Sequence, residues 1–405
     1  MLKDKPLHIA IDGNEANTLS RVGSNVYAYQ VLKAIESETA HTNTIVTVLL
    51  AQPPVQDLPK KRAGWNYLVI NPKQFWTQWA LPIHLQTHKN SYSAFFTPGH
   101  YAPRLCPIPY ISTVMDTAYL PYPEQFKKSD THKLTSWTKY SVKHAHKVLT
   151  ISEFTKSEVL KYYQKSESDV FVGYPGTTPT NHTISDTFRK KTLRKFKIKQ
   201  PFILYVGTLQ PRKNLATLVK AFGLFSRMLA SRSLTKKTSK KSHSAAVSPQ
   251  LVIAGRVGWL AQSLLESIKK SPLSERIITT GFVSDTEKQV LYEEAFVSTL
   301  LGLYEGFGIP PLESFYYGTP VVAANTSSLP EVIGDAGLLV PATNASAIAE
   351  AFYTVFTASA QQKLIWKRRG IKQTKQFSWD STAQTILSEL QQLADVTTNE
   401  KVHGK

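Results

Sequence analysis

The stretch Leu301–Pro341 reads LGLYEGFGIPPLESFYYGTPVVAANTSSLPEVIGDAGLLVP, and it indicates the fold of the chain around it. An apolar run, Val321–Ala324, is typical of a buried parallel strand, and it stands between two segments that begin as helices do, at Pro310–Pro311 and after Thr326–Ser328. The exposed N–H groups and dipoles of two such helix starts favour a phosphate ligand. An ordinary α/β repeat with ordinary caps explains the same signals.

Two carboxylates in this stretch are separated by seven residues. Glu305 precedes Gly306-Phe307-Gly308, where two glycines allow the backbone to approach a ligand closely. Glu313 follows Pro310–Pro311, so we expect it in the first turn of the helix that starts there.

Glu305 and Glu313, in EGFGIPPLE, resemble the E-x7-E motif of the retaining glycosyltransferases of family 4, the glycosyl transferases group 1. The resemblance continues to Pro341 and implies the GT-B fold: α/β, with two Rossmann-like doubly wound parallel-sheet domains facing each other across a cleft. It also implies that Glu305 and the amides of Gly306–Gly308 address the donor sugar, and that Glu313 holds the ribose. The helix start at Ser328 and Leu329 is a further donor-binding candidate.

A second candidate loop lies in PFILYVGTLQPRKNLATLVKAF, Pro201–Phe222, where an apolar strand ends at Gly207 and two cations follow, Arg212 and Lys213. Cations at a helix start oppose the helix dipole, which favours an anionic partner. GTLQPRKN resembles the donor-diphosphate loop of the family, which implies that both cations neutralise the leaving diphosphate without a metal. The segment Gly281–Asp285, which follows an expected strand, also resembles the nucleotide domain of the family, and this resemblance implies that its backbone contacts the nucleotide base.

The first half of the chain resembles the family more weakly. Asp116 follows an apolar strand in STVMDTAYL, which resembles the His-Asp-Leu segment of the family, but Met115 stands where the family has histidine. His100 also follows a strand and is the candidate replacement on the acceptor side, a solvated loop histidine being the alternative. Gly23, beside a helix start, is a further acceptor-side candidate.

Apolar runs alternate with helical patterns along the whole chain, as in doubly wound sheets. Besides the segments above, we expect strands at Ile45–Leu50, Asn66–Ile70, Ala94–Thr97, Tyr110–Val114, Lys147–Ile151, Gln250–Ala254 and Arg276–Thr280. The predicted domains are residues 1–190, completed by a C-terminal helix at 378–396, and residues 198–376.

The 405 residues carry a net charge of +19, which raises the question of an anionic partner. Much of this charge lies in two stretches without acidic residues, Arg189–Lys199 and Ser231–Pro249. Neither stretch matches a nucleic-acid-binding motif, so no nucleic acid is expected. A solvated linker and loop is one interpretation, and attraction to an anionic membrane surface is the other.

Cys106 is the single cysteine, so internal disulfides and multi-cysteine zinc sites are excluded. The N-terminal sequence lacks the pattern of a signal peptide, and no apolar stretch is long enough for a membrane span. We therefore expect a cytoplasmic protein, with peripheral contact to the inner face of the membrane as an extension of the charge argument.

Taken together, these resemblances imply a retaining, metal-independent hexosyltransferase that takes its sugar from a nucleotide-sugar and has no cofactor. By resemblance the enzyme is mannosyltransferase-like, and its acceptor is a glycan or lipid-linked saccharide of cell-envelope polysaccharide synthesis. A catalytically impaired GT-B scaffold that binds sugar, and an enzyme of the glycogen- or sucrose-synthase type, are the alternatives.

Overall fold

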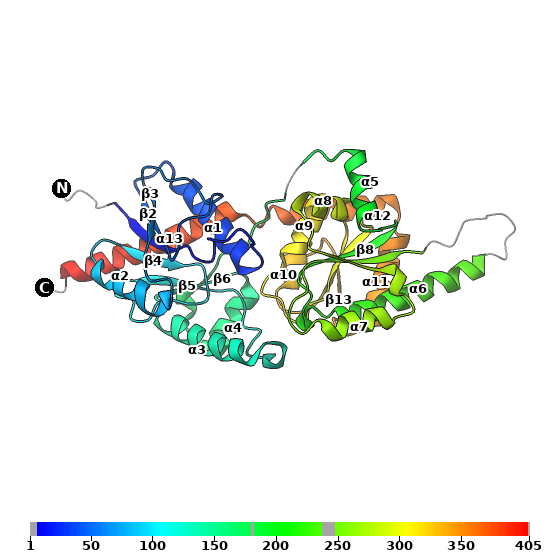
Figure 1. The fold of residues 1–405 in the computed structure, drawn as a ribbon, viewed down its shortest axis with the longest axis horizontal. Coiled ribbons are helices and arrows are strands. Elements are labelled where there is room, and N and C mark those ends of the chain that lie inside the picture. Colours follow the sequence, from blue (N-terminus) through cyan, green and yellow to red (C-terminus); the bar gives the residue numbers. More distant parts are fainter. Residues whose placement is uncertain (1–5, 180–181, 237–247, 404–405) are drawn as a thin grey trace. The chain divides into compact units, whose positions relative to one another are not determined.

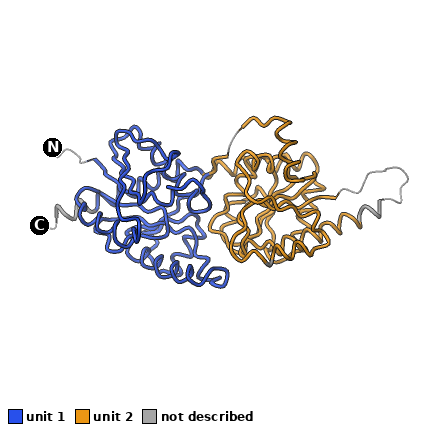
Figure 2. The backbone as a smooth tube through the Cα atoms, in the orientation of Figure 1, with its two compact units in different colours: residues 1–176, 378–405 blue, residues 177–377 orange. Residues whose placement is uncertain are grey.

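The computed structural model describes residues 6–179, 182–236 and 248–403, and the chain divides into two compact units (Figures 1 and 2). Unit 1 comprises residues 1–176 and 378–405, and unit 2 comprises residues 177–377. The C-terminal helix therefore belongs to the unit that contains the N-terminus, where it packs against α1.

Within the described residues, unit 1 is built on a seven-stranded parallel sheet with the order β3-β2-β1-β4-β5-β6-β7. Its central strands are buried at every position or nearly so, as expected for a sheet covered on both faces. The elements are β1 His8–Asp12, α1 Ser24–Thr39, β2 Ile45–Leu50, β3 Trp65–Val69, the π-helix η1 Trp76–Ala80, α2 Leu81–Thr87, β4 Ala94–Thr97, β5 Tyr110–Val114, the 3₁₀ turn η2 Pro123–Gln125, α3 Lys128–His144, β6 Lys147–Thr150, α4 Glu153–Tyr163, the 3₁₀ turn η3 Glu167–Asp169, β7 Val170–Val172 and α13 Trp379–His403.

The described part of unit 2 holds a six-stranded parallel sheet with the order β10-β9-β8-β11-β12-β13. Helices α6 and α11 pack against each other over a core of apolar side chains from the sheet. The elements are α5 Asp186–Lys195, β8 Phe202–Val206, the 3₁₀ turn η4 Pro211–Lys213, α6 Leu215–Lys236, β9 Gln250–Ala254, α7 Gln262–Lys270, the 3₁₀ turn η5 Ser274–Arg276, β10 Ile277–Gly281, α8 Asp285–Glu294, β11 Val297–Leu300, α9 Ile309–Tyr317, β12 Val321–Ala324, α10 Leu329–Ile333, β13 Leu338–Val340, α11 Ala345–Thr357 and α12 Ala360–Thr374.

Each sheet has one point at which the strand order reverses. In unit 1 this point lies between β1 and β4, and in unit 2 it lies between β8 and β11. The loops after the two strands turn towards opposite faces of the sheet, which leaves a crevice at the carboxyl ends of the strands. Ligands of doubly wound sheets bind there, so these two points locate the candidate sites.

The basic stretch at 189–199 differs from its predicted form. Residues 186–195 form α5, which packs on α8, and Arg189 makes ion pairs of 2.8 Å with Glu293 and 2.7 Å with Glu294. The segment is therefore a helix docked on unit 2 rather than a solvated linker. For the same reason residues 177–190, which we assigned to the first domain, belong to unit 2.

The second basic stretch, 231–249, begins as helix rather than loop, because α6 continues to Lys236. Residues 237–247 lie outside the described residues. Among the helices that are described, none combines the length and the apolar composition needed to cross a membrane.

Candidate active site

Arg212, Lys213 and Glu305 come together at the strand-order reversal of unit 2. The two cations lie in the turn η4 after β8, and Glu305 follows the neighbouring strand β11. The Nζ atom of Lys213 lies 2.8 Å from Oε1 and 2.6 Å from Oε2 of Glu305, and Nη1 of Arg212 lies 3.8 Å from Oε2. The pairing of β8 with β11 thus assembles one charged cluster from two sequence motifs.

The cluster is largely shielded from water. Glu305 is only 5% exposed, and a carboxylate at such a depth is strongly destabilised unless cations and hydrogen bonds compensate its charge. The neighbouring Tyr205 lies in the same environment, and the pKa of its hydroxyl is raised. Burial is the main cause of the rise, the negative charge of Glu305 adds to it, and the charge of Arg212 opposes it. Two cations facing one carboxylate leave one positive charge in excess, which suits an anionic ligand.

The loop that carries Glu305 is shaped by one glycine and two serines. A Cβ atom on Gly302 would lie 2.3 Å from Oε1 of Glu305, so only glycine leaves room for the carboxylate. The N–H of Glu305 donates to the hydroxyl of Ser327 at 2.9 Å. The hydroxyl of Ser328 donates to the carbonyl oxygens of Glu305, at 2.9 Å, and of Phe307, at 2.7 Å. The carboxylate is therefore held by its backbone as well as by its ion pair.

Three predicted donor-binding residues of this stretch support the loop from the inside. Ser328 and Leu329 are fully buried, and the N–H of Leu329 donates to the carbonyl of Thr326 at 3.1 Å. Phe307 is 3% exposed, and its ring packs edge-on against Phe377 at 5.3 Å between ring centroids. The side chains of these three residues therefore pack in the protein interior, and the amide of Leu329 is used in a hydrogen bond within the protein.

Glu313 lies apart from this cluster and has its own partners. Its Oε1 accepts a hydrogen bond from Nζ of Lys288 at 2.7 Å, and its Oε2 accepts one from the hydroxyl of Tyr292 at 3.0 Å. The predicted place in the first helical turn was wrong: α9 already begins at Ile309, so Glu313 is its fifth residue. Gly308 caps the helix with φ 118°, a conformation that favours glycine and lets the helix begin before the prolines.

Lys288 is a site residue that the sequence motifs missed. Burial lowers the pKa of Lys288, but the carboxylates of Glu313 and Asp285 raise it more, so its net shift is upward and the ammonium stays charged. It precedes Tyr292 by four residues on α8, and this spacing places both on one helix face. The spacing was visible in the sequence, but the contact of that face with α9 was not.

Glycines bring the loops after β8 and β9 together. A Cβ atom on Gly255 would lie 1.9 Å from the carbonyl oxygen of Gly207, so the two backbones are in direct contact. Gly281, at the end of β10, has φ 69°, and no described atom lies within 4 Å of the position of its Cβ. Close packing thus explains the glycine at 255, whereas Gly207, with φ 153°, and Gly281 both have a backbone conformation that favours glycine.

At the strand-order reversal of unit 1, Glu15, His100 and Asp116 lie close enough to interact electrostatically. Burial lowers the pKa of His100, whereas the charges of Asp116 and Glu15 oppose this shift. The Nδ1 atom of His100 is buried and has no hydrogen-bond partner among the described residues. Asn25 donates to Oε2 of Glu15 at 2.7 Å and fixes the carboxylate beside the α1 N-terminus. The structure thus brings His100 and Asp116 together.

The other two residues discussed for the first half differ in their exposure. Met115 is 7% exposed and contributes to the interior. Gly23 is the N-cap of α1 with φ 54°, and among the described residues nothing lies within 4 Å of where its Cβ would be. Only Gly23 is therefore open to an approaching group.

The charged groups of unit 2 determine which kind of ligand the site can bind. Two cations suit a diphosphate, and a carboxylate such as Glu313 accepts more hydrogen bonds than its two present partners supply. The described residues contain no group of three His, Cys, Asp or Glu side chains arranged to hold a metal ion. The arrangement suits a ligand that carries both phosphates and hydroxyls.

Comparisons with known proteins agree with this arrangement. Residues 187–373 match the family model described as glycosyl transferases group 1. The chain is 29% identical over 282 residues to O-antigen chain mannosyltransferase B of Escherichia coli. The aligned stretch covers 68% of this chain and 68% of the relative. It is 27% identical over 228 residues to an O-antigen chain mannosyltransferase of Salmonella typhimurium, and this alignment covers 56% of this chain and 55% of the relative.

The solved structures extend the similarity to both units. HepE of Anabaena, in complex with UDP and glucose, superposes with a TM-score of 0.69 at 14% identity, over 96% of this chain and all of that chain. At this identity the likeness establishes the fold alone. The expected pair of Rossmann-like parallel-sheet domains of the GT-B fold is therefore confirmed.

The buried ion pair yields a prediction about stability. Lys213→Met leaves Glu305 with only the more distant Arg212, so we expect the free energy of unfolding to fall by about 3 kcal/mol. In the double variant Lys213→Met/Glu305→Gln, the stranded charge is gone and most of the loss should be recovered. Urea unfolding followed by circular dichroism measures both values. Lys220→Met, at an exposed position of α6, is the matched control, and equal losses in single and double variants would contradict the prediction.

Proposed function

We propose that this chain is a metal-independent, retaining hexosyltransferase that uses a nucleotide-sugar, because residues 187–373 match the family model described as glycosyl transferases group 1. The proposed acceptor is a glycan or a lipid-linked saccharide of cell-envelope polysaccharide synthesis. The O-antigen mannosyltransferases among its relatives support this acceptor class and a mannose-like sugar. The matched stretch spans about two thirds of the first relative and about half of the second.

The buried cluster of Arg212, Lys213 and Glu305 is the observation that carries the proposal. It lies where doubly wound sheets bind their ligands, and it has one positive charge in excess. A nucleotide-sugar places a diphosphate next to a sugar, which matches two cations next to a carboxylate. The HepE structure with UDP and glucose supports the same class of ligand for this fold.

In the proposed reaction the bond between the anomeric carbon and the β-phosphate oxygen breaks, and its electron pair stays on the phosphate. A bond from the acceptor oxygen to the anomeric carbon forms on the same face of the sugar, and the acceptor proton passes to the departing phosphate oxygen. Arg212 and Lys213 stabilise the charge that grows on this oxygen. Because both are already held in place, little reorganisation is needed as the bond breaks.

Glu305 and Glu313 have separate roles in this proposal. Glu305 fixes Lys213 and lies beside the reacting sugar, with the Gly306–Gly308 loop held in shape by Ser328. Glu313 accepts hydrogen bonds from the ribose hydroxyls, and Lys288 keeps its carboxylate oriented. The different partners of the two carboxylates support this division.

Transfer to a lipid-linked acceptor would take place at a membrane surface, so we also place the protein at the cytoplasmic face of a membrane by peripheral contact. A catalytically impaired scaffold is the second candidate, because Met115 replaces the expected histidine. The presence of all four predicted charged residues in unit 2, Arg212, Lys213, Glu305 and Glu313, argues against an impaired scaffold. Donor hydrolysis by the purified protein, over a panel of UDP-, GDP- and ADP-sugars, separates the two candidates.

Arg212→Ala should lower kcat by roughly 10²–10³, because one group that stabilises the developing diphosphate charge is lost. The affinity for the bare nucleoside, which carries no phosphate, should change far less. Steady-state kinetics and calorimetry measure the two effects, with the exposed Arg227→Ala as control. Activity that disappears in EDTA and returns with magnesium or manganese would overturn the metal-independent part of the proposal.

Neutralising Glu305 and neutralising Glu313 should have different effects on the kinetics. Glu313→Gln should raise the donor KM about ten- to a hundredfold, since hydrogen bonds to a charged group are weakened in ground and transition states alike. Glu305→Gln should instead lower kcat, with a smaller change in KM. The exposed Glu350→Gln controls for the loss of charge alone. An unchanged kcat in Glu305→Gln, together with loss of turnover at normal affinity in Glu313→Gln, would reverse the assignment.

His100 should act on the acceptor side of the reaction. His100→Ala removes the unpartnered Nδ1, so we expect the acceptor kcat/KM to fall by about three- to tenfold, the value of a neutral hydrogen bond. Donor hydrolysis should keep its rate. The matched control is Met115→Leu, a change of similar volume at a buried position, which should leave both activities intact. Equal loss of transfer and hydrolysis in His100→Ala would count against the assignment.

A further inference from the structure

The helices η1 and α2 of unit 1 have one buried face and one apolar face in solvent. Trp76, Ala80, Leu81 and Leu85 pack into the core beneath the sheet. On the outer face Phe75 is 68% exposed, Trp79 is 65% exposed and Ile83 is 59% exposed. Their spacing of four residues places them in one row along the helix axis. We call these three residues the apolar row.

Along the chain, the charged residues on either side of the apolar row are all of one sign. Between Asp57 and Asp116 the sequence contains no acidic residue, although the whole chain has 29 among its 405 residues. Lys73 precedes the row by two residues, and Lys89 follows the end of α2 by two. Both are exposed, and neither takes part in an ion pair in the described part of the chain.

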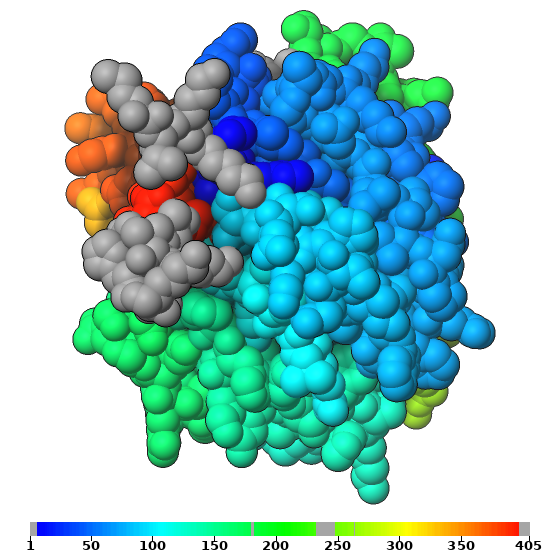
Figure 3. All heavy atoms as spheres, turned by 90° about the vertical axis from the view of Figure 1, so that its left-hand side faces the viewer, coloured from blue at the N-terminus to red at the C-terminus, as the bar shows by residue number. Residues whose placement is uncertain are grey.

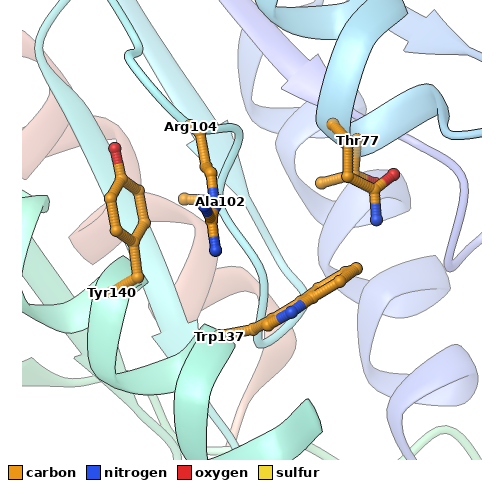
Figure 4. Close-up of a pocket in the computed structure, with 6 residues that line it drawn as sticks. Thr77, Ala102, Arg104, Trp137 and Tyr140 are labelled. Atoms are coloured by element: carbon orange, nitrogen blue, oxygen red, sulfur yellow. The ribbon is translucent and has the colours of Figure 1, made fainter.

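A pocket beside η1 extends this surface towards α3. It is lined by Thr77 and Gln78 of η1, Ala102 and Arg104 of the loop after β4, and Trp137 and Tyr140 of α3. Figure 4 shows Arg104 reaching between the rings of Tyr140 and Trp137, and its guanidinium carbon lies 5.4 Å from the centroid of the Tyr140 ring.

Two further residues give this pocket the same character. Lys133 of α3 stands 4.8 Å from the ring centroid of Trp137. Leu105, next to Arg104, is 83% exposed. The surface between α2 and α3 therefore carries aromatic, aliphatic and cationic side chains.

In the view of Figure 3, light-blue and cyan atoms, the colours of α2 and of the loop after β4, occupy the centre of the face of unit 1 that is turned to the viewer. From the apolar row, the cations beside it and the absence of acidic residues between Asp57 and Asp116, we propose that this face docks the protein on the surface of an anionic phospholipid bilayer. Trp79 and Phe75 would enter the interface between headgroups and acyl chains, while Lys73, Lys89 and Arg104 meet the phosphates.

The charge pattern favours a bilayer over other occupants. A second copy of the chain would bring the same cations against this face, and like charges would repel. A bilayer instead offers phosphates to the cations and an apolar layer to the row. The proposed lipid-linked acceptor is the reason to expect a bilayer at all, and only in that respect does the inference rest on the proposed function.

Co-sedimentation of the full chain with vesicles tests the surface. Wild type should bind vesicles that contain phosphatidylglycerol much more tightly than pure phosphatidylcholine vesicles, and added salt should weaken the binding. The triple variant Phe75→Gln/Trp79→Gln/Ile83→Gln and the double variant Lys73→Gln/Arg104→Gln should each lose affinity on the order of tenfold or more. Leu364→Gln, at an exposed apolar position of α12 in unit 2, should bind as wild type does.

The same variants separate this inference from the proposed transfer reaction. All of them should hydrolyse the donor, and transfer to a water-soluble acceptor, at the wild-type rate, because none changes a residue of the proposed site. Unchanged vesicle binding by both variants, or equal wild-type binding to neutral and anionic vesicles, would overturn the docking surface. Vesicle binding as described, in a protein without transferase activity, would overturn the proposed function and leave the docking surface standing.

Discussion

The ion pair between Lys213 and Glu305 is the constraint on which the rest of unit 2 depends. A carboxylate that is 5% exposed has to meet its cation at a fixed place, and the parallel pairing of β8 with β11 supplies that place. Gly302 clears the space for the carboxylate, and Asn214, with φ 58°, binds the carbonyls of Leu301 and Ala342 at 3.1 and 2.7 Å. Three strand-end loops are thereby tied together around one charged pair.

Sequence patterns predicted the parts of the structure that depend on short-range order. The strands Ile45–Leu50, Ala94–Thr97 and Tyr110–Val114 have the expected bounds, because continuous apolar runs between loops leave little freedom for a parallel strand. The bounds of the first domain were wrong, since the position of α5 depends on its apolar contacts and ion pairs with α8, which its own composition does not reveal. An exposed basic stretch and a docked basic helix look alike until the partner helix is known.

The candidate site was predictable to the same degree. The motifs identified Arg212, Lys213, Glu305 and Glu313, but they gave no sign that Lys213 pairs with one carboxylate and Lys288 with the other. Such contacts join elements that are distant in sequence and are fixed only by packing. The apolar row of unit 1 was hidden for another reason: apolar residues occupy both faces of the segment 75–85, so the sequence does not show which face is exposed.

The contact between Gly207 and Gly255 bears on how the loops after β8 and β9 can change within this fold. Because a Cβ atom on Gly255 would stand 1.9 Å from the Gly207 carbonyl, neither loop can be rebuilt without regard to the other. In evolution, a new side chain at one of these positions would need a compensating shift of the neighbouring backbone before selection could act on it. For protein engineering, the loops after β8 and β9 form a single exchangeable module, and chimaeras should take both from the same parent.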